Sequence, residues 1–259
     1  YFKLYFNLDS NFSLHLHVFH HEYFIDIHKY NEMFYLSNHC ILIEFFVYYD
    51  VFLNYKFFFP MLIMLDLKKN ILGKVVGPNN SQINGIDHHV VDGETFQSCG
   101  LEFSVIEIPG HTLDHIAYFI NDGYQPILFC GDTLFSAGCG RVFEGTHKQM
   151  YESLMKLREL PENTLVYCAH EYTVNNLKFA LEVEPNNEDI VQHLTACEEK
   201  INDGEITLPS SIDTELKINP FMRCGHKDLR RSIANKDIDA EHDSDIKIFG
   251  HLRSWKDSF

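Results

Sequence analysis

Hydrophobic and polar positions follow two different patterns along this chain, and the change comes near residue 70. Residues 1–60 are rich in aromatic and aliphatic side chains but keep no steady period of two or 3.6 residues. Beyond residue 74, short apolar runs are separated by Gly, Pro, Asn and Asp, a pattern typical of strands joined by turns. We therefore expect regular secondary structure from residue 74 onward.

This second part predicts strands first and helices afterwards. Apolar runs predict strands over residues 74–78, 101–108, 115–120, 126–130 and 165–168. Thr146 is a suitable N-cap for a helix that runs to residue 160 and stops at Pro161. Two more helices are expected over residues 171–182 and 188–203, the second ended by Gly204. The last third of the chain should be mainly helical.

Residues 1–72 form an aberrant segment by composition. Residues 1–60 contain no Gly, Ala, Arg, Gln or Thr, yet they hold 12 of the 22 Phe and 8 of the 13 Tyr. One interpretation is an aromatic-rich β region. We favour the other, sequence that does not encode a native element, such as a misread or non-coding stretch, because its local signals never agree with one another.

Charge and cysteine usage limit the partners and the compartment. The chain has 21 Lys and Arg against 37 Asp and Glu, a formal net charge of −16, which disfavours nucleic acid and anionic lipid. The apolar stretch 41–65 is interrupted by Glu44, Asp50 and Lys56, so a membrane span is not expected. Seven scattered cysteines without a C-x-x-C pair, and no recognisable secretory signal, favour the cytoplasm.

Candidate metal ligands follow three of the predicted strands. They lie in the segments Pro109-Gly110-His111-Thr112, Gly131-Asp132-Thr133 and Ala169-His170-Glu171. A single His after a strand is usually an ordinary histidine, and a single Gly-Asp-Thr is commonly a turn. Their combination in this order favours one shared site.

These segments resemble the metallo-β-lactamase superfamily, and other segments narrow the resemblance to glyoxalase II, the hydroxyacylglutathione hydrolases. The narrower match is carried by residues 136–146 (SAGCGRVFEGT), 166–173 (VYCAHEYT), 183–186, 208–210, 219–223 and 229–231. The resemblance implies an α/β protein, with a partial αββα sandwich over residues 73–170 and a helical substrate-binding domain over residues 171–259. The implied partner of this monomer is a small glutathione thioester.

The resemblance also implies a pair of metal ions and the residues that bind them. His111 would bind the first ion, His170 the second, and Asp132 would bridge both and act in catalysis. Imidazole and carboxylate suit Zn²⁺, two per subunit, although iron or manganese would also fit. A metal-bound hydroxide would then cleave S-lactoylglutathione to glutathione and D-lactate without a serine or cysteine nucleophile.

Four further residues match family positions that contact glutathione. They are Arg141, Tyr172, Arg253 and Lys256. Arg and Lys suit the carboxylates of the tripeptide. Without the resemblance, Arg253 and Lys256 would be interpreted as a solvated helix face.

The superfamily motif H-x-H-x-D-H is missing where it should occur. It is expected within residues 54–64, which read NYKFFFPMLIM and offer no ligand. His15, His17 and His20 have the spacing, but Phe19 replaces the Asp and the run lies too far upstream. Each metal would keep two protein ligands instead of three, so we expect weak metal binding and little or no activity from this chain.

Two alternatives and one departure from the family pattern accompany this interpretation. The alternatives are a non-catalytic remnant that binds glutathione conjugates and, less favoured, a persulfide dioxygenase with a single iron. Asp114 stands where the family has Gly, which would cost energy if that position needs a positive φ. His115 is expected to support the site or the fold rather than bind metal.

Overall fold

The computed structural model describes residues 74–79, 83–98, 100–235 and 242–259. It also gives the course of four short strands, β1 (Leu4–Phe6), β2 (Leu14–Val18), β3 (His21–Tyr23) and β4 (Cys40–Leu42). Residues 54–64, where the motif H-x-H-x-D-H was expected, lie outside the described residues. So does most of the aberrant segment 1–72.

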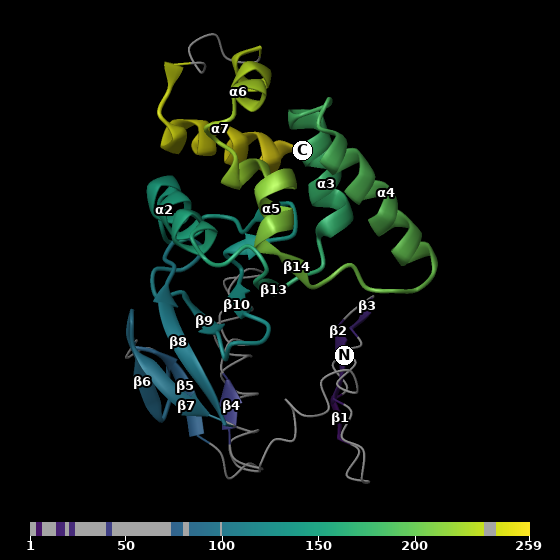
Figure 1. The fold of residues 1–259 in the computed structure, drawn as a ribbon. Coiled ribbons are helices and arrows are strands. Elements are labelled where there is room, and N and C mark those ends of the chain that lie inside the picture. The colour runs from purple at the N-terminus through teal and green to yellow at the C-terminus, as the bar shows by residue number, and fades with distance from the viewer. Residues whose placement is uncertain are drawn as a thin grey trace.

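The largest sheet among the described residues has six strands, in the order β14-β13-β10-β9-β8-β7 (Figure 1). Its strands are β7 (Thr95–Ser98), β8 (Leu101–Glu107), β9 (Ile116–Ile120), β10 (Ile127–Gly131), β13 (Leu165–Cys168) and β14 (Ser210–Ser211). Neighbours are antiparallel except β10 and β13, which are parallel. In β8 and β9, apolar side chains on successive positions point to opposite faces, and both faces are covered.

One face of this sheet packs against a second, smaller sheet of β4, β5 (Lys74–Pro78) and β6 (His88–Val90). Val76 and Val90 from the small sheet share an apolar core with Phe103 and Tyr118 from the large one. The Tyr118 hydroxyl donates a hydrogen bond to the Val76 carbonyl at 3.3 Å, which satisfies the one polar group of that buried ring.

Helix α2 (His147–Arg158) covers the other face. It begins with a capping box, in which the Thr146 side chain accepts from the Gln149 amide and the Gln149 side chain accepts from the Thr146 amide. Met150, Leu154 and Leu157 are its buried apolar positions, spaced three and four residues apart.

The rest of the chain is mainly helical and shares this core. Its elements are α3 (Thr173–Val183), α4 (Glu188–Asn202), α5 (Ile212–Ile218), the 3₁₀ turn η3 (Pro220–Met222), α6 (Lys227–Ala234) and α7 (Asp245–Ser258). Phe249 and Leu252 of α7 belong to the same buried cluster as α2. Figure 1 shows the helices gathered beyond one end of the sheet.

All the expected elements are confirmed to within two residues at each end. The five predicted strands form, as do the helices after Thr146, over 171–182 and over 188–203. Strands β6 and β7, the hairpin β11 (Leu134–Phe135) and β12 (Gly138–Cys139), and β14 were not foreseen. Among the described residues, no helix combines the length and the apolar character needed to cross a membrane.

Candidate metal centre

The sheet brings the three segments that carry the expected ligands to one edge. Strands β8, β10 and β13 run in the same direction, since β9 is antiparallel to both β8 and β10 and β13 is parallel to β10. Their carboxyl ends therefore meet at the same edge of the sheet. His111, Asp132 and His170 each follow one of these ends, which is why residues far apart in sequence can converge.

The Asp132 carboxylate lies between the two imidazoles. Its Oδ2 is 3.7 Å from His111 Nε2, and its Oδ1 is 3.5 Å from His170 Nε2. The side chains of His111 and Asp132 are 2% exposed and that of His170 is 26% exposed. One carboxylate oxygen thus faces each ring.

The hydrogen bonds of His111 decide which of its nitrogens carries the proton. Its Nδ1 lies 2.8 Å from the carbonyl oxygen of Arg141, and a carbonyl can only accept, so Nδ1 is the donor. Burial holds the pKa of His111 below its ordinary value, and the ring is neutral at neutral pH. Its Nε2 has no hydrogen-bond partner and presents a lone pair to Asp132.

His170 is also a neutral imidazole. Burial, assisted by the positive charge that His111 can carry, lowers the pKa of His170 to about 4. Its ring stacks on Tyr172, with centroids 4.9 Å apart. Tyr172, one of the expected substrate contacts, therefore borders the second expected ligand directly.

His115 supports the backbone of Asp132. Its Nδ1 donates to the Ile116 carbonyl at 3.2 Å, and its Nε2 accepts from the Asp132 amide at 3.1 Å. Both nitrogens are engaged, so this buried ring positions Asp132 rather than binding metal. Gly131 makes the contact possible because a Cβ there would lie 2.5 Å from His115 Cε1. Asp114, the residue before His115, is not at positive φ, so the expected cost does not arise.

Among the described residues, no three His, Cys, Asp or Glu side chains are grouped to hold a single ion. Asp132 lies beside one imidazole on each side, His111 and His170. We call the pair Asp132 and His111, and the pair Asp132 and His170, the two half-sites.

Two of the four expected substrate residues lie around one carboxylate. Asp257 Oδ1 is 3.0 Å from Arg253 Nη2 and 3.7 Å from Arg141 Nε. Arg253 is only 4% exposed, and its Nη1 donates to the Cys139 carbonyl at 2.9 Å. Arg253 therefore links α7 to β12, while the Arg141 side chain is 64% exposed and can reach a ligand.

Lys256 presents a partly dehydrated ammonium group. Its Nζ donates to the Asn175 carbonyl at 3.2 Å and lies over the rings of Phe179 and Phe259. Burial, together with the nearby charge of Arg253, lowers the pKa of Lys256 to about 8. The amine is charged below that pH and can still pair with a carboxylate.

Comparison with known proteins identifies the family of this chain. The sequence model described as "Hydroxyacylglutathione hydrolase C-terminus" matches residues 171–259, and that of the "Metallo-beta-lactamase superfamily" matches residues 19–170. The hydroxyacylglutathione hydrolase of Pseudomonas syringae pv. syringae is 45% identical over 194 residues, which cover 75% of this chain and 74% of that protein. The chain belongs to the hydroxyacylglutathione hydrolase family.

A second curated relative supports the same placement, and one solved structure gives a partial match. The hydroxyacylglutathione hydrolase of Photobacterium profundum is 47% identical over 185 residues, 71% of each chain. The crystal structure of ETHE1 from Myxococcus xanthus aligns with a TM-score of 0.44 at 24% identity, covering 74% of this chain and 68% of that one. The superfamily match begins at residue 19, whereas this domain was expected to start at residue 73. The domain boundaries stay predictions.

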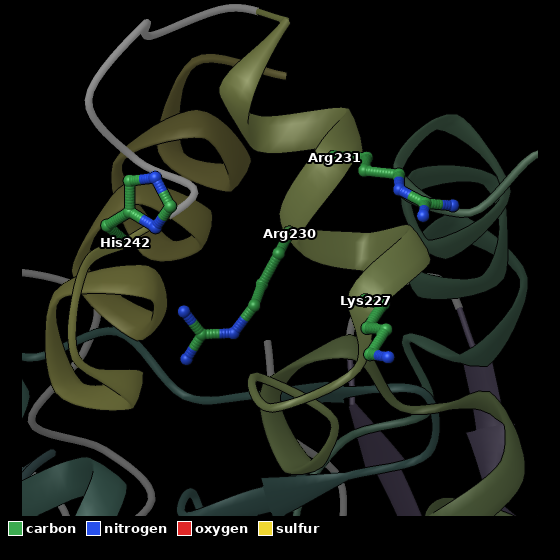
Figure 2. Close-up of a pocket in the computed structure, with 4 residues that line it drawn as sticks. All are labelled: Lys227, Arg230, Arg231 and His242. Atoms are coloured by element: carbon green, nitrogen blue, oxygen red, sulfur yellow. The ribbon is translucent and has the colours of Figure 1, made fainter.

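A basic pocket on α6 lies outside the site of this hydroxyacylglutathione hydrolase family member. It measures about 340 Å³ and is lined by Lys227, Arg230, Arg231 and His242. Figure 2 shows Arg230 and Arg231 pointing to opposite sides of the helix. Arg230 pairs with Asp245 and Arg231 with Asp228, so most of this positive charge is already neutralised within the chain.

Proposed function

We propose that this fold serves to hydrolyse S-(2-hydroxyacyl)glutathione to glutathione and a 2-hydroxy acid, D-lactate when the substrate is S-lactoylglutathione. We further propose that this chain as written does so weakly or not at all. The proposal rests on one observation, the buried Asp132 carboxylate flanked by two neutral imidazoles whose Nε2 atoms face it.

The donor atoms fit a pair of divalent cations. A carboxylate oxygen and an imidazole lone pair are both acceptors, so their approach in a buried place is stabilised when a cation lies between them. A metal-binding histidine commonly donates its other N–H to a carbonyl, as His111 does to Arg141. His111 with Asp132 would hold one Zn²⁺, and His170 with Asp132 the other, with iron or manganese also suitable.

The bound metal would supply Lewis-acid activation of water and of the thioester carbonyl. The chain's own residues orient the substrate. The exposed Arg141 guanidinium and the Lys256 ammonium suit the carboxylates of glutathione, and Tyr172 beside His170 offers an apolar face near the reacting centre. Arg253 contributes to substrate orientation indirectly, because it donates hydrogen bonds to the Asp257 carboxylate and to the Cys139 carbonyl.

Low activity follows from the ligand count. Catalytic zinc sites normally have three protein ligands and water, whereas each half-site among the described residues has two. Residues 54–64, where the family's H-x-H-x-D-H is expected, contain no His, Asp or Glu.

The test measures release of free thiol from S-lactoylglutathione by the purified, zinc-loaded chain. We expect a rate close to that of buffer, and activity when residues 1–72 are replaced by an N-terminal segment that carries the H-x-H-x-D-H motif. His111→Ala should abolish the activity of that chimera. A native chain that hydrolyses the substrate at a rate lost in His111→Ala would contradict the impairment, and an inactive but folded chimera would contradict the hydrolase assignment.

A second function, binding of glutathione conjugates without catalysis, is favoured by the surroundings of Arg141 and Lys256. Arg141 pairs with Asp257, and Lys256 bonds to the Asn175 carbonyl and lies over two aromatic rings, so both cations are held by groups other than the expected metal ligands. Calorimetry with S-methylglutathione, with and without Zn²⁺, distinguishes the two functions, because a non-catalytic remnant would bind equally well in both.

A further inference from the structure

A short hairpin joins the expected metal ligand Asp132 to Arg141. It consists of β11 and β12 with a two-residue turn, Ser136-Ala137. Ala137 has φ 55°, and it is the one non-glycine residue at positive φ in the described part of the chain. This conformation costs about 1–2 kcal/mol for an L-residue, so it persists only where its surroundings hold it.

Three polar side chains from the C-terminal helical region hold the backbone of this turn. Asn176 of α3, Glu215 of α5 and Asn219 directly after α5 are 5%, 0% and 0% exposed; we call them the hairpin clamp. Their bonds are Asn176 Nδ2 to Ser136 O at 3.0 Å, Ala137 N to Glu215 Oε2 at 2.8 Å, and Asn219 Nδ2 to Gly138 O at 2.9 Å.

The clamp is itself a connected, buried network. Asn219 Nδ2 is 2.8 Å from Glu215 Oε2, and the Ser210 hydroxyl donates to Glu215 Oε1. Burial raises the pKa of Glu215 to about 7, although its hydrogen bonds from Ser210, Asn219 and Ala137 oppose that shift. A buried carboxyl is costly and is not in general the most stabilising choice at a core position. The position of the Glu215 carboxyl, which accepts from the Ala137 amide, suits a role in fixing the turn.

The two ends of the hairpin carry contacts that define the site. One end of the hairpin follows Asp132. There the Gly140 amide donates a hydrogen bond to the Thr133 carbonyl at 3.2 Å. At the other end, the Arg141 carbonyl accepts from His111 Nδ1. The fit is tight, since a Cβ on Gly138 would lie 2.6 Å from Asn176 Nδ2.

We propose that Asn176, Glu215 and Asn219 are positioning residues, which act through the hairpin to fix Asp132 and the Arg141 carbonyl and so set the affinity of the site for divalent cations. The link to cations rests on the proposed function, whereas the link to the backbone of residues 132–141 does not. The helical region would thereby shape the metal site as well as contact the substrate.

The test compares Glu215→Ala with Glu215→Gln in the full chain. The Gln amide oxygen can still accept from Ala137 and Asn219, and its NH₂ can donate to Ser210, so Gln should rescue what Ala loses. An exposed control, Glu205→Ala, accounts for the loss of one negative charge. Asn176→Ala, which removes a single bond to Ser136, serves if Glu215→Ala does not fold.

Two measurements are made on each variant, native-state hydrogen exchange and Co²⁺ titration followed by visible absorption. In Glu215→Ala we expect the Ala137 and Gly140 amides to exchange about ten-fold faster relative to the β9 amides, the scale of one lost charge-assisted bond. The Co²⁺ affinity of Glu215→Ala should also fall about ten-fold. Glu215→Gln and Glu205→Ala should stay close to wild type in both measurements.

A uniform rise in exchange across all strands, with unchanged Co²⁺ affinity, would show that the clamp is merely structural and overturn the proposal. If the wild-type chain binds no Co²⁺, the proposed metal function fails, and the exchange of residues 132–141 alone decides whether the clamp positions this segment.

Discussion

Replacing Gly131 with Ala should displace the backbone of Asp132, because Gly131 packs against the ring of His115. Gly131 has φ +51°, which costs an Ala about 1–2 kcal/mol. The new Cβ would also lie 2.5 Å from His115 Cε1 and 2.9 Å from Nε2, where ordinary contact begins near 3.4 Å. The ring can move only by giving up its bond to the Asp132 amide. An unsatisfied buried N–H adds about 1–3 kcal/mol, so we expect a total loss of about 2–5 kcal/mol.

Gly123→Ala is the matched control. Gly123 also has a positive φ, +89°, but no atom lies within 4 Å of the position that the new methyl group would take, so this variant carries only the backbone cost. Urea unfolding of the two variants at neutral pH isolates the effect of the His115 contact. Co²⁺ titration adds a second readout, since a displaced Asp132 should weaken binding in Gly131→Ala alone. Equal losses of stability in both variants would refute the reasoning.

Three further predictions concern buried charges. Arg223→Ala leaves the Glu184 carboxylate, 5% exposed and held by two 2.9 Å bonds, without its partner, and urea unfolding should show a loss of about 3–5 kcal/mol; a loss below about 1 kcal/mol would be inconsistent with this pair. Because the folded pKa of Glu215 is raised from 4.5 to about 7, the folded state binds more protons, and wild-type stability should fall as pH rises through that window and then level off. Glu215→Gln should lack this decline. If stability from urea unfolding changes with pH in the same way in wild type and Glu215→Gln, this prediction is wrong. Since the pKa of Lys256 is about 8, affinity for S-methylglutathione measured by calorimetry should fall between pH 7 and 9, and Lys256→Met should show no such fall.

The convergence of the three side chains could be predicted from sequence because it depends on local signals. Each of His111, Asp132 and His170 follows an apolar run that predicts a strand, and strands of one direction bring such positions to one edge. Thr146 and Pro161 likewise mark the two ends of α2, because an N-cap and a proline act on the backbone next to them.

Other features of the site depend on contacts between distant residues, which no local pattern reveals. Arg253 was expected to bind substrate, and the structure buries it against the Cys139 carbonyl, 114 positions away. Glu215 was not singled out, because an acidic residue in a short helix normally faces solvent. Its role shows only when Ala137, 78 positions earlier, is placed beside it.

The short strands also escaped prediction for a physical reason. Strands β11, β12 and β14 have two residues each, too few to show an alternating pattern. The hairpin of β11 and β12 exists because side chains of the helical region satisfy its turn, as Asn176 does for Ser136. Its sequence carries no Asn-Gly or Asp-Gly signal of a tight turn.

The most direct test of the proposed metal centre is Co²⁺ titration of wild type, Asp132→Asn and His89→Ala, followed by visible absorption. Asp132 faces both imidazoles, whereas His89 lies on β6 and bonds to the Pro78 carbonyl. We expect weak, saturable binding by wild type and His89→Ala, and none by Asp132→Asn. Binding by Asp132→Asn that equals wild type would contradict the claim that this carboxylate joins two cation sites.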